Sequence, residues 1–99
     1  MIRYYIVVFD RDVSKAYGPF HDGFVGHPKV LRWWHYIKSC YIIGTELDKN
    51  GLSNHFAQTA EHFGISTTHL VMKVDLRFRQ GMLTKDAWDW IQKNARGQT

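Results

Sequence analysis

The first strongly patterned segment runs from Ile2 to Phe9, where almost every position is β-branched or aromatic. A run without a polar face is typical of a strand that is covered on both sides. Residues 40–45 have a similar pattern, and only Lys38 and Ser39 separate them from residues 30–37. A connection of two residues predicts a β-hairpin, so we expect residues 30–37 to be a strand. The alternative makes residues 29–38 helical, in a three-stranded α/β layer.

Three later segments carry helical or strand periodicity. Residues 52–63 predict a helix that ends before Gly64, and a last helix is predicted to begin after Thr84, a good N-cap. Between these helices, hydrophobic and polar residues alternate over residues 69–78, which predicts a strand. Its inward positions are predicted to be Leu70, Met72, Val74, Leu76 and Phe78, and Lys73, Arg77 and Arg79 are predicted to face outward.

Residues 11–29 are rich in helix-breaking residues, with a Gly18-Pro19 pair and further glycines at 23 and 26. A long helix is disfavoured there, and we expect an ordered loop over residues 18–27. The element order then predicts an α+β, ferredoxin-like βαββαβ fold with an irregular first crossover and an added C-terminal helix. No repeat or linker divides the chain, so we expect residues 1–99 to form a single domain with residues 96–99 as a frayed tail.

Composition narrows the possible partners. Thirteen Lys and Arg against nine Asp and Glu give a net charge of +4, which permits anionic partners such as nucleotides or nucleic acid. Six Phe, five Tyr and four Trp are many for a small domain, so some rings are expected at a surface or an oligomer interface. Cys40 is the single cysteine, which excludes a disulfide within the chain. No apolar run is long enough to span a membrane and no signal peptide is evident, so we expect a cytoplasmic protein.

Three short motifs resemble a known family. They are Val7-Val8-Phe9-Asp10, the Trp33-Trp34-His35 block followed by Tyr41-Ile42-Ile43 and Thr45, and Ala87-Trp88-Asp89-Trp90. Together they resemble the SinR-like proteins and, more distantly, the small CRISPR-associated adaptation endonucleases. This resemblance implies a ferredoxin-like dimer. For the nuclease branch it also implies Mg²⁺ held across the two-fold axis by paired aspartates, at the position of Asp10. The family's first helix falls on the Gly- and Pro-containing residues 18–28, where this chain departs from the pattern.

Asp10 is therefore the candidate catalytic and metal-binding residue of a Mg²⁺-dependent endonuclease. A carboxylate where a strand ends suits a hard cation, which prefers oxygen ligands and keeps several waters. The structural alternative is that Asp10 stabilises a turn.

A second set of residues combines rings with cations. We expect Trp33, Trp34 and His35 to provide stacking and polar contacts, Arg77 and Arg79 to contact phosphate, and His21 and Phe24 to lie on a closing loop. In a strand, the adjacent tryptophans face opposite sides, so both cannot stack on one ligand.

The leading functional hypothesis is a homo-oligomeric, non-catalytic module that binds a nucleotide-like anion or nucleic acid such as RNA. Rings stack on bases and cations attract phosphates, and no cofactor is required. The alternatives are the endonuclease, the one case that calls for Mg²⁺, and a structural dimer whose rings line the interface.

Overall fold

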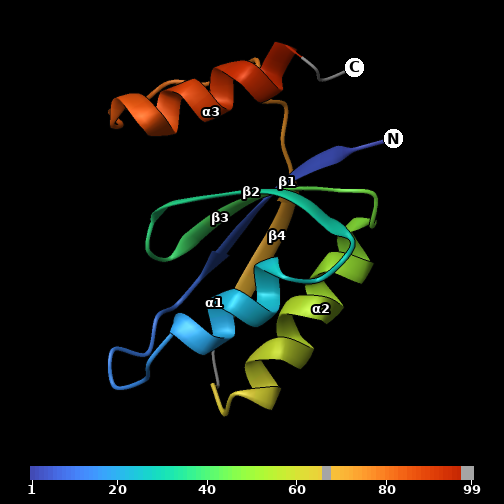
Figure 1. The fold of residues 1–99 in the computed structure, drawn as a ribbon, viewed down its shortest axis with the longest axis vertical. Coiled ribbons are helices and arrows are strands. Elements are labelled where there is room, and N and C mark those ends of the chain that lie inside the picture. The colour runs from blue at the N-terminus through green and yellow to red at the C-terminus, as the bar shows by residue number, and fades with distance from the viewer. Residues whose placement is uncertain (66–67, 97–99) are drawn as a thin grey trace.

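The described residues form a three-layer α+β structure. It is a computed structural model that describes residues 1–65 and 68–96, so most of the predicted C-terminal tail lies outside the described residues. A four-stranded sheet has α1 and α2 on one face and α3 on the other (Figure 1). The elements are β1 (Arg3–Phe9), α1 (Gly18–Val25), β2 (Val30–Ile37), β3 (Cys40–Thr45), α2 (Lys49–His62), β4 (His69–Lys73) and α3 (Lys85–Arg96).

The strand order is β2-β3-β1-β4 and every pair is antiparallel, consistent with a ferredoxin-like arrangement. The predicted hairpin is confirmed, since β2 and β3 pair across Lys38 and Ser39. Residues 30–37 are therefore a strand and not a helix. The β2–β3 register shifts twice, between Val30 and Arg32 and between Trp34 and Ile37, so β2 is irregular along its length.

The predicted irregular first crossover is wrong, because residues 18–25 form the helix α1. Pro19 lies in the first turn, where its missing N–H has no partner to lose. Phe20 and Phe24 lie one helical turn apart and are fully buried. Burying each of them contributes about 1.5–3 kcal/mol, more than the roughly 1 kcal/mol that a helical glycine costs. At Gly23, an added Cβ would lie 3.1 Å from Cε2 of Phe63, so the glycine lets α1 approach the end of α2.

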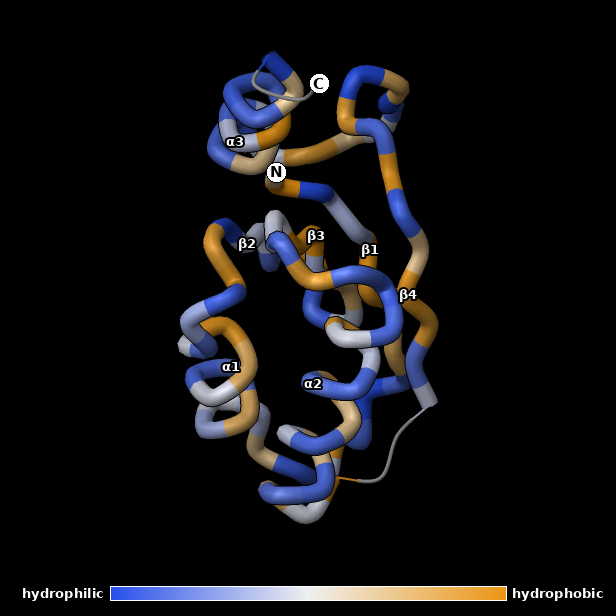
Figure 2. The backbone as a smooth tube through the Cα atoms, turned by 90° about the vertical axis from the view of Figure 1, so that its right-hand side faces the viewer, coloured by the Kyte–Doolittle hydropathy of each residue, from blue (hydrophilic) through white to orange (hydrophobic). Residues whose placement is uncertain are grey.

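Two hydrophobic clusters fill the spaces above and below the sheet. The cluster between the sheet and the α1–α2 layer is the larger; it includes Tyr5, Val7, Phe20, Phe24, Tyr41, Leu52 and Phe56. The cluster under α3 includes Tyr4, Trp34, Ile42, Leu76, Ala87, Ile91 and Ala95. Figure 2 shows hydrophobic positions along the strands of the middle layer and mixed positions on the helices that cover it. The central strand β1 is therefore covered on both faces, as its sequence predicts.

A strand is present within residues 69–78 as predicted, but it is shorter than predicted, and the side predicted to face inward is mostly exposed. β4 ends at Lys73, and Val71 packs against the larger cluster. Leu70 and Met72 point to the other face of the sheet and are exposed. Leu76 alone of the predicted inward residues is buried, beneath α3.

The two helices predicted over residues 52–63 and after Thr84 are confirmed as α2 and α3, but α2 begins three residues earlier than predicted, at Lys49. Asp48 caps α2 by accepting a hydrogen bond from the Gly51 N–H at 2.7 Å, and Gly64 follows the helix with φ +67°. Thr84 caps α3 by accepting from the Ala87 N–H at 3.4 Å. In the part of the chain that the structure describes, no helix combines the length and the hydrophobicity needed to cross a bilayer.

Candidate functional site

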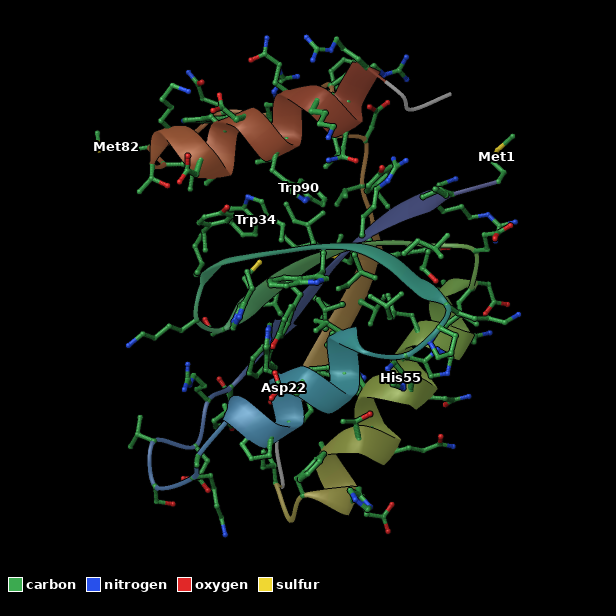
Figure 3. All side chains as sticks on the ribbon, in the orientation of Figure 1. Met1, Asp22, Trp34, His55, Met82 and Trp90 are labelled. Carbon is green, nitrogen blue, oxygen red and sulfur yellow. The ribbon has the colours of Figure 1, made fainter. Side chains whose placement is uncertain are left out.

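The two adjacent tryptophans of β2 lie on opposite sides of the sheet. Trp34 is 2% exposed and lies in the layer beneath α3, where its Nε1–H donates to the Ala87 carbonyl oxygen at 3.2 Å (Figure 3). Trp33 is 44% exposed and lies on the α1 side. The prediction that one tryptophan faces away from the other is confirmed. Of the two, only Trp33 is available to a ligand.

Trp33 belongs to a group of four rings, which we call the ring cluster: His21, Trp33, His35 and Tyr41. His21 of α1 meets Trp33 edge-on, with ring centroids 4.9 Å apart and an interplanar angle of 81°. His35 stacks on Tyr41 at 4.0 Å and lies nearly parallel to His21 at 5.2 Å. The structure thus brings together Trp33 and His35, which were predicted to contact a ligand, and His21, which was predicted to lie on a closing loop. The first two lie on β2 and His21 lies on α1.

Hydrogen bonds fix the rings of the cluster in place. The Nδ1 of His21 and the hydroxyl of Tyr41 are 2.8 Å apart, and the Nε2–H of His35 donates to the Lys38 carbonyl oxygen at 2.9 Å. Burial raises the pKa of the Tyr41 hydroxyl well above its usual value, so this hydroxyl keeps its proton. Trp33 therefore packs against a histidine that is itself held by the Tyr41 hydroxyl.

Charged side chains of both signs act on the ring cluster, because, besides the effect of burial, Arg11 lowers the pKa of Tyr41 while the Asp22 carboxylate raises it. Arg11 lies with its guanidinium 4.5 Å from the centroid of the Tyr17 ring, and it acts electrostatically on both His35 and Tyr41. Burial lowers the pKa of His35; the hydrogen bond to Lys38 opposes this effect, while His21 and Arg11 add to it. His35 is accordingly neutral at pH 7, and the lasting positive charge comes from Arg11.

Lowering the pH is expected to destabilise the protein through His35. Because its pKa is lower in the folded state, the unfolded chain binds more protons below the ordinary value of about 6.5. The contribution of His35 to the free energy of unfolding should be constant above about pH 6.5 and should fall as the pH drops below that value. The slope is at most about 1.4 kcal/mol per pH unit for one histidine. Urea denaturation at pH 7.5 and 5.5 measures it, and His35→Gln should reduce the dependence, leaving the part due to His55, whose pKa burial also lowers. An equal slope in this variant would contradict the assignment to His35.

The other predicted ligand contacts lie elsewhere. Phe24 is fully buried between α1 and α2, with its ring 5.3 Å from that of Phe56. Arg77 and Arg79 follow the end of β4 and do not lie on an outward strand face, because the strand stops at Lys73. Arg77 forms an ion pair with Asp75 at 2.6 Å, and the Nη1 of Arg79 donates to the Leu76 carbonyl oxygen at 3.1 Å.

Asp10 lies exposed just beyond the end of β1. Its Oδ2 accepts a hydrogen bond from the Thr68 hydroxyl at 3.0 Å, which ties the end of β1 to the residue before β4. Over residues 1–65 and 68–96, no group of three or more His, Cys, Asp or Glu side chains gathers as a metal site. The Mg²⁺-dependent endonuclease stays a prediction.

Three members of the ring cluster were predicted from the sequence as site residues: His21, Trp33 and His35. Tyr41 and Arg11 were not predicted to belong to the site, and nothing in the spacing of residues indicated that they approach His35. The helix α1 was not predicted from the sequence, and it is this helix, packed on the sheet, that brings His21 to the β2–β3 hairpin. The single cysteine, Cys40, is buried, and this burial raises the pKa of its thiol.

Comparison with known proteins adds no relative. No protein-family model, curated protein or solved structure matches this chain. The resemblance to SinR-like proteins and adaptation endonucleases stays a prediction.

Proposed function

We propose that this protein binds single-stranded nucleic acid or a nucleotide, with a base stacked on Trp33. The observation that carries the proposal is a half-exposed tryptophan on an edge strand, held edge-on by His21, whose own ring stacks on His35 and Tyr41. A ring that is already immobilised loses little conformational entropy when a base stacks on it. Such stacking contributes about 1–3 kcal/mol per base.

The cations near the ring cluster support an anionic ligand. Lys38 lies exposed in the hairpin turn next to His35, and Arg11 acts on the same ring. Within the described residues, neither of them forms an ion pair with a carboxylate, so both charges are available to phosphates. The net charge of +4 favours the same kind of ligand at long range.

Trp33→Ala is expected to weaken binding of a labelled single-stranded oligonucleotide by roughly 5-fold to 100-fold, the loss of one stacked base. Fluorescence anisotropy at low salt measures the change, with RNA and DNA oligonucleotides in separate titrations. The matched control is Tyr36→Ala, because Tyr36 is an exposed ring on the same strand that packs against Trp34 on the opposite side. This control should bind as the wild type does.

Salt dependence gives a second reading of the same interaction. Affinity for the oligonucleotide should fall steeply as salt rises if Arg11 and Lys38 contact phosphates. No binding by the folded wild type at low salt would sink the proposal. So would an equal loss of affinity in Trp33→Ala and Tyr36→Ala.

The homo-oligomer predicted from the abundance of aromatic residues stays a proposal, as does the structural dimer. Exposed apolar side chains lie on the α3 face of the sheet beyond the cover of α3, among them Val8, Leu70 and Met72. A contact between sheets would bury them.

A further inference from the structure

A small cavity lies on the opposite side of β2 from the ring cluster. Its volume is about 310 Å³, and it is lined by Arg32 of β2 and by Trp90, Lys93 and Asn94 of α3. Figure 3 shows Trp90 pointing from α3 toward the sheet. Ligand pockets begin at about 300 Å³, so the cavity has room for a small group.

Buried neutral groups hold Arg32 at the edge of this cavity. Its Nη1 donates to the Tyr4 hydroxyl at 2.7 Å and to Oδ1 of Asn94 at 3.1 Å. The Tyr4 hydroxyl in turn donates to the same Oδ1 at 2.9 Å, and Asn94 donates from Nδ2 to the Trp90 carbonyl oxygen at 2.8 Å. Tyr4 and Asn94 are both buried, so one side of the guanidinium is fixed by a connected network.

Within the described residues, no carboxylate forms an ion pair with this guanidinium. Its hydrogen bonds within the described chain use one nitrogen, Nη1, and both acceptors are uncharged. Lys93 lines the same cavity, and in the described part of the chain neither cation forms an ion pair. No carboxylate side chain is among the residues that line the cavity. Among residues 1–65 and 68–96, two cations without an ion-pair partner therefore border one space.

We propose that this cavity is a binding site for a terminal phosphate group. A guanidinium presents a planar fork of donors that matches phosphate oxygens, and a lysine ammonium adds a second positive charge. Two neighbouring cations suit a phosphate dianion better than a singly charged carboxylate. The ring of Trp90 borders the phosphate position and offers a surface to a planar group that carries it, as in a nucleoside monophosphate.

The site is independent of base stacking at Trp33, since it uses residues on the other side of β2 and on α3. The proposal is tested by titrating ¹⁵N-labelled protein with inorganic phosphate and, separately, with a nucleoside 5′-monophosphate, at constant ionic strength. Shifts should concentrate on the backbone amides of Arg32, Lys93 and Asn94 and on the indole N–H of Trp90. If the monophosphate binds more tightly than inorganic phosphate, the nucleoside attached to the phosphate contacts the Trp90 ring.

Lys93→Gln and Arg32→Gln should each weaken phosphate binding roughly 10-fold to 100-fold, because each removes a charge-assisted hydrogen bond. Lys93 is exposed and forms no ion pair within the described residues, so its variant guards against misfolding at Arg32. The matched control is Lys85→Gln, which removes the same charge from the same helix about 12 Å away along its axis. Lys85 forms an ion pair with Asp89 outside the cavity, and its variant should bind phosphate as the wild type does.

Three results would overturn the proposal: shifts that avoid the cavity, equal weakening by Lys85→Gln, or acetate binding as tightly as phosphate at equal ionic strength. Its failure is separable from failure of the proposed function. A chain that binds the oligonucleotide through Trp33 but does not bind phosphate would refute the phosphate site alone. A chain that binds phosphate but no oligonucleotide would refute stacking at Trp33 alone.

Discussion

Trp34→Ala is expected to lower the free energy of unfolding by about 3–5 kcal/mol, the usual cost of removing a large buried ring. The side chain is almost fully buried between the sheet and α3, and the change also removes its hydrogen bond to the Ala87 carbonyl oxygen. Because Trp34 is one of the largest side chains in the cluster under α3, this helix should lose more protection than the α1–α2 layer. Urea denaturation and amide hydrogen exchange of α3 measure the two effects.

The neighbouring tryptophan provides the control for this experiment. Trp33→Ala removes the same side chain from the next position, but there the ring is half-exposed and its packing partner is His21. We expect a loss of only about 1 kcal/mol, the magnitude of one aromatic pair. Equal destabilisation by the two variants would contradict the placement of the two rings on opposite sides of β2.

Phe24→Ala is the second substitution with a large expected effect, again about 3–5 kcal/mol. The ring is fully buried, it stacks on Phe20 at 5.8 Å, and it packs edge-on against both Phe56 and Tyr41. A small domain has a total stability of only about 5–15 kcal/mol. The variant should therefore lose a large share of that stability, and its melting temperature, followed by far-ultraviolet circular dichroism, should fall by about 12–40 °C.

Phe78→Ala is the matched control for Phe24, since the same ring at that position is 82% exposed. Its melting temperature should stay within a few degrees of the wild type. If Phe24→Ala were as stable as this control, residues 18–25 would not be packed as α1 is in the structure.

The strands and the last two helices could be predicted from sequence because each carries its own local signal. β-Branched runs mark β1 and β3, the two-residue connection marks the hairpin, Gly64 marks the end of α2, and Thr84 marks the start of α3. Helix α1 carries the opposite signal, because its glycines and Pro19 disfavour a helix in isolation. Its stability comes from burying Phe20 and Phe24 against elements far away in the chain, which local propensity does not contain.

The faces of β4 illustrate a second limit of sequence patterns. Alternation over residues 69–78 shows that two faces exist, but it does not show which one meets the α1–α2 layer. Val71 meets it, while the more hydrophobic-looking set with Leu70 and Met72 does not. The same reasoning explains why Arg77 and Arg79 were placed on a strand face that ends before them.

Within the candidate site, strand periodicity was enough to separate Trp33 from Trp34. It was not enough to bring His21 to His35, because that approach depends on the position of α1 over the hairpin. The cavity beside Arg32 was also beyond prediction, since it needs α3 to lie across β2. Sites assembled from distant elements are visible only once the packing of those elements is known.

The two register shifts in β2 affect how this protein can meet other chains. An edge strand presents unpaired N–H and C=O groups, and a straight one can accept a further strand and extend the sheet into aggregates. In β2 the shifts on either side of the two tryptophans interrupt the regular spacing of these groups. A neighbouring strand would meet only short stretches with matching geometry. The irregular edge therefore keeps Trp33 and Arg32 accessible to small or flexible ligands while it discourages uncontrolled strand-to-strand association.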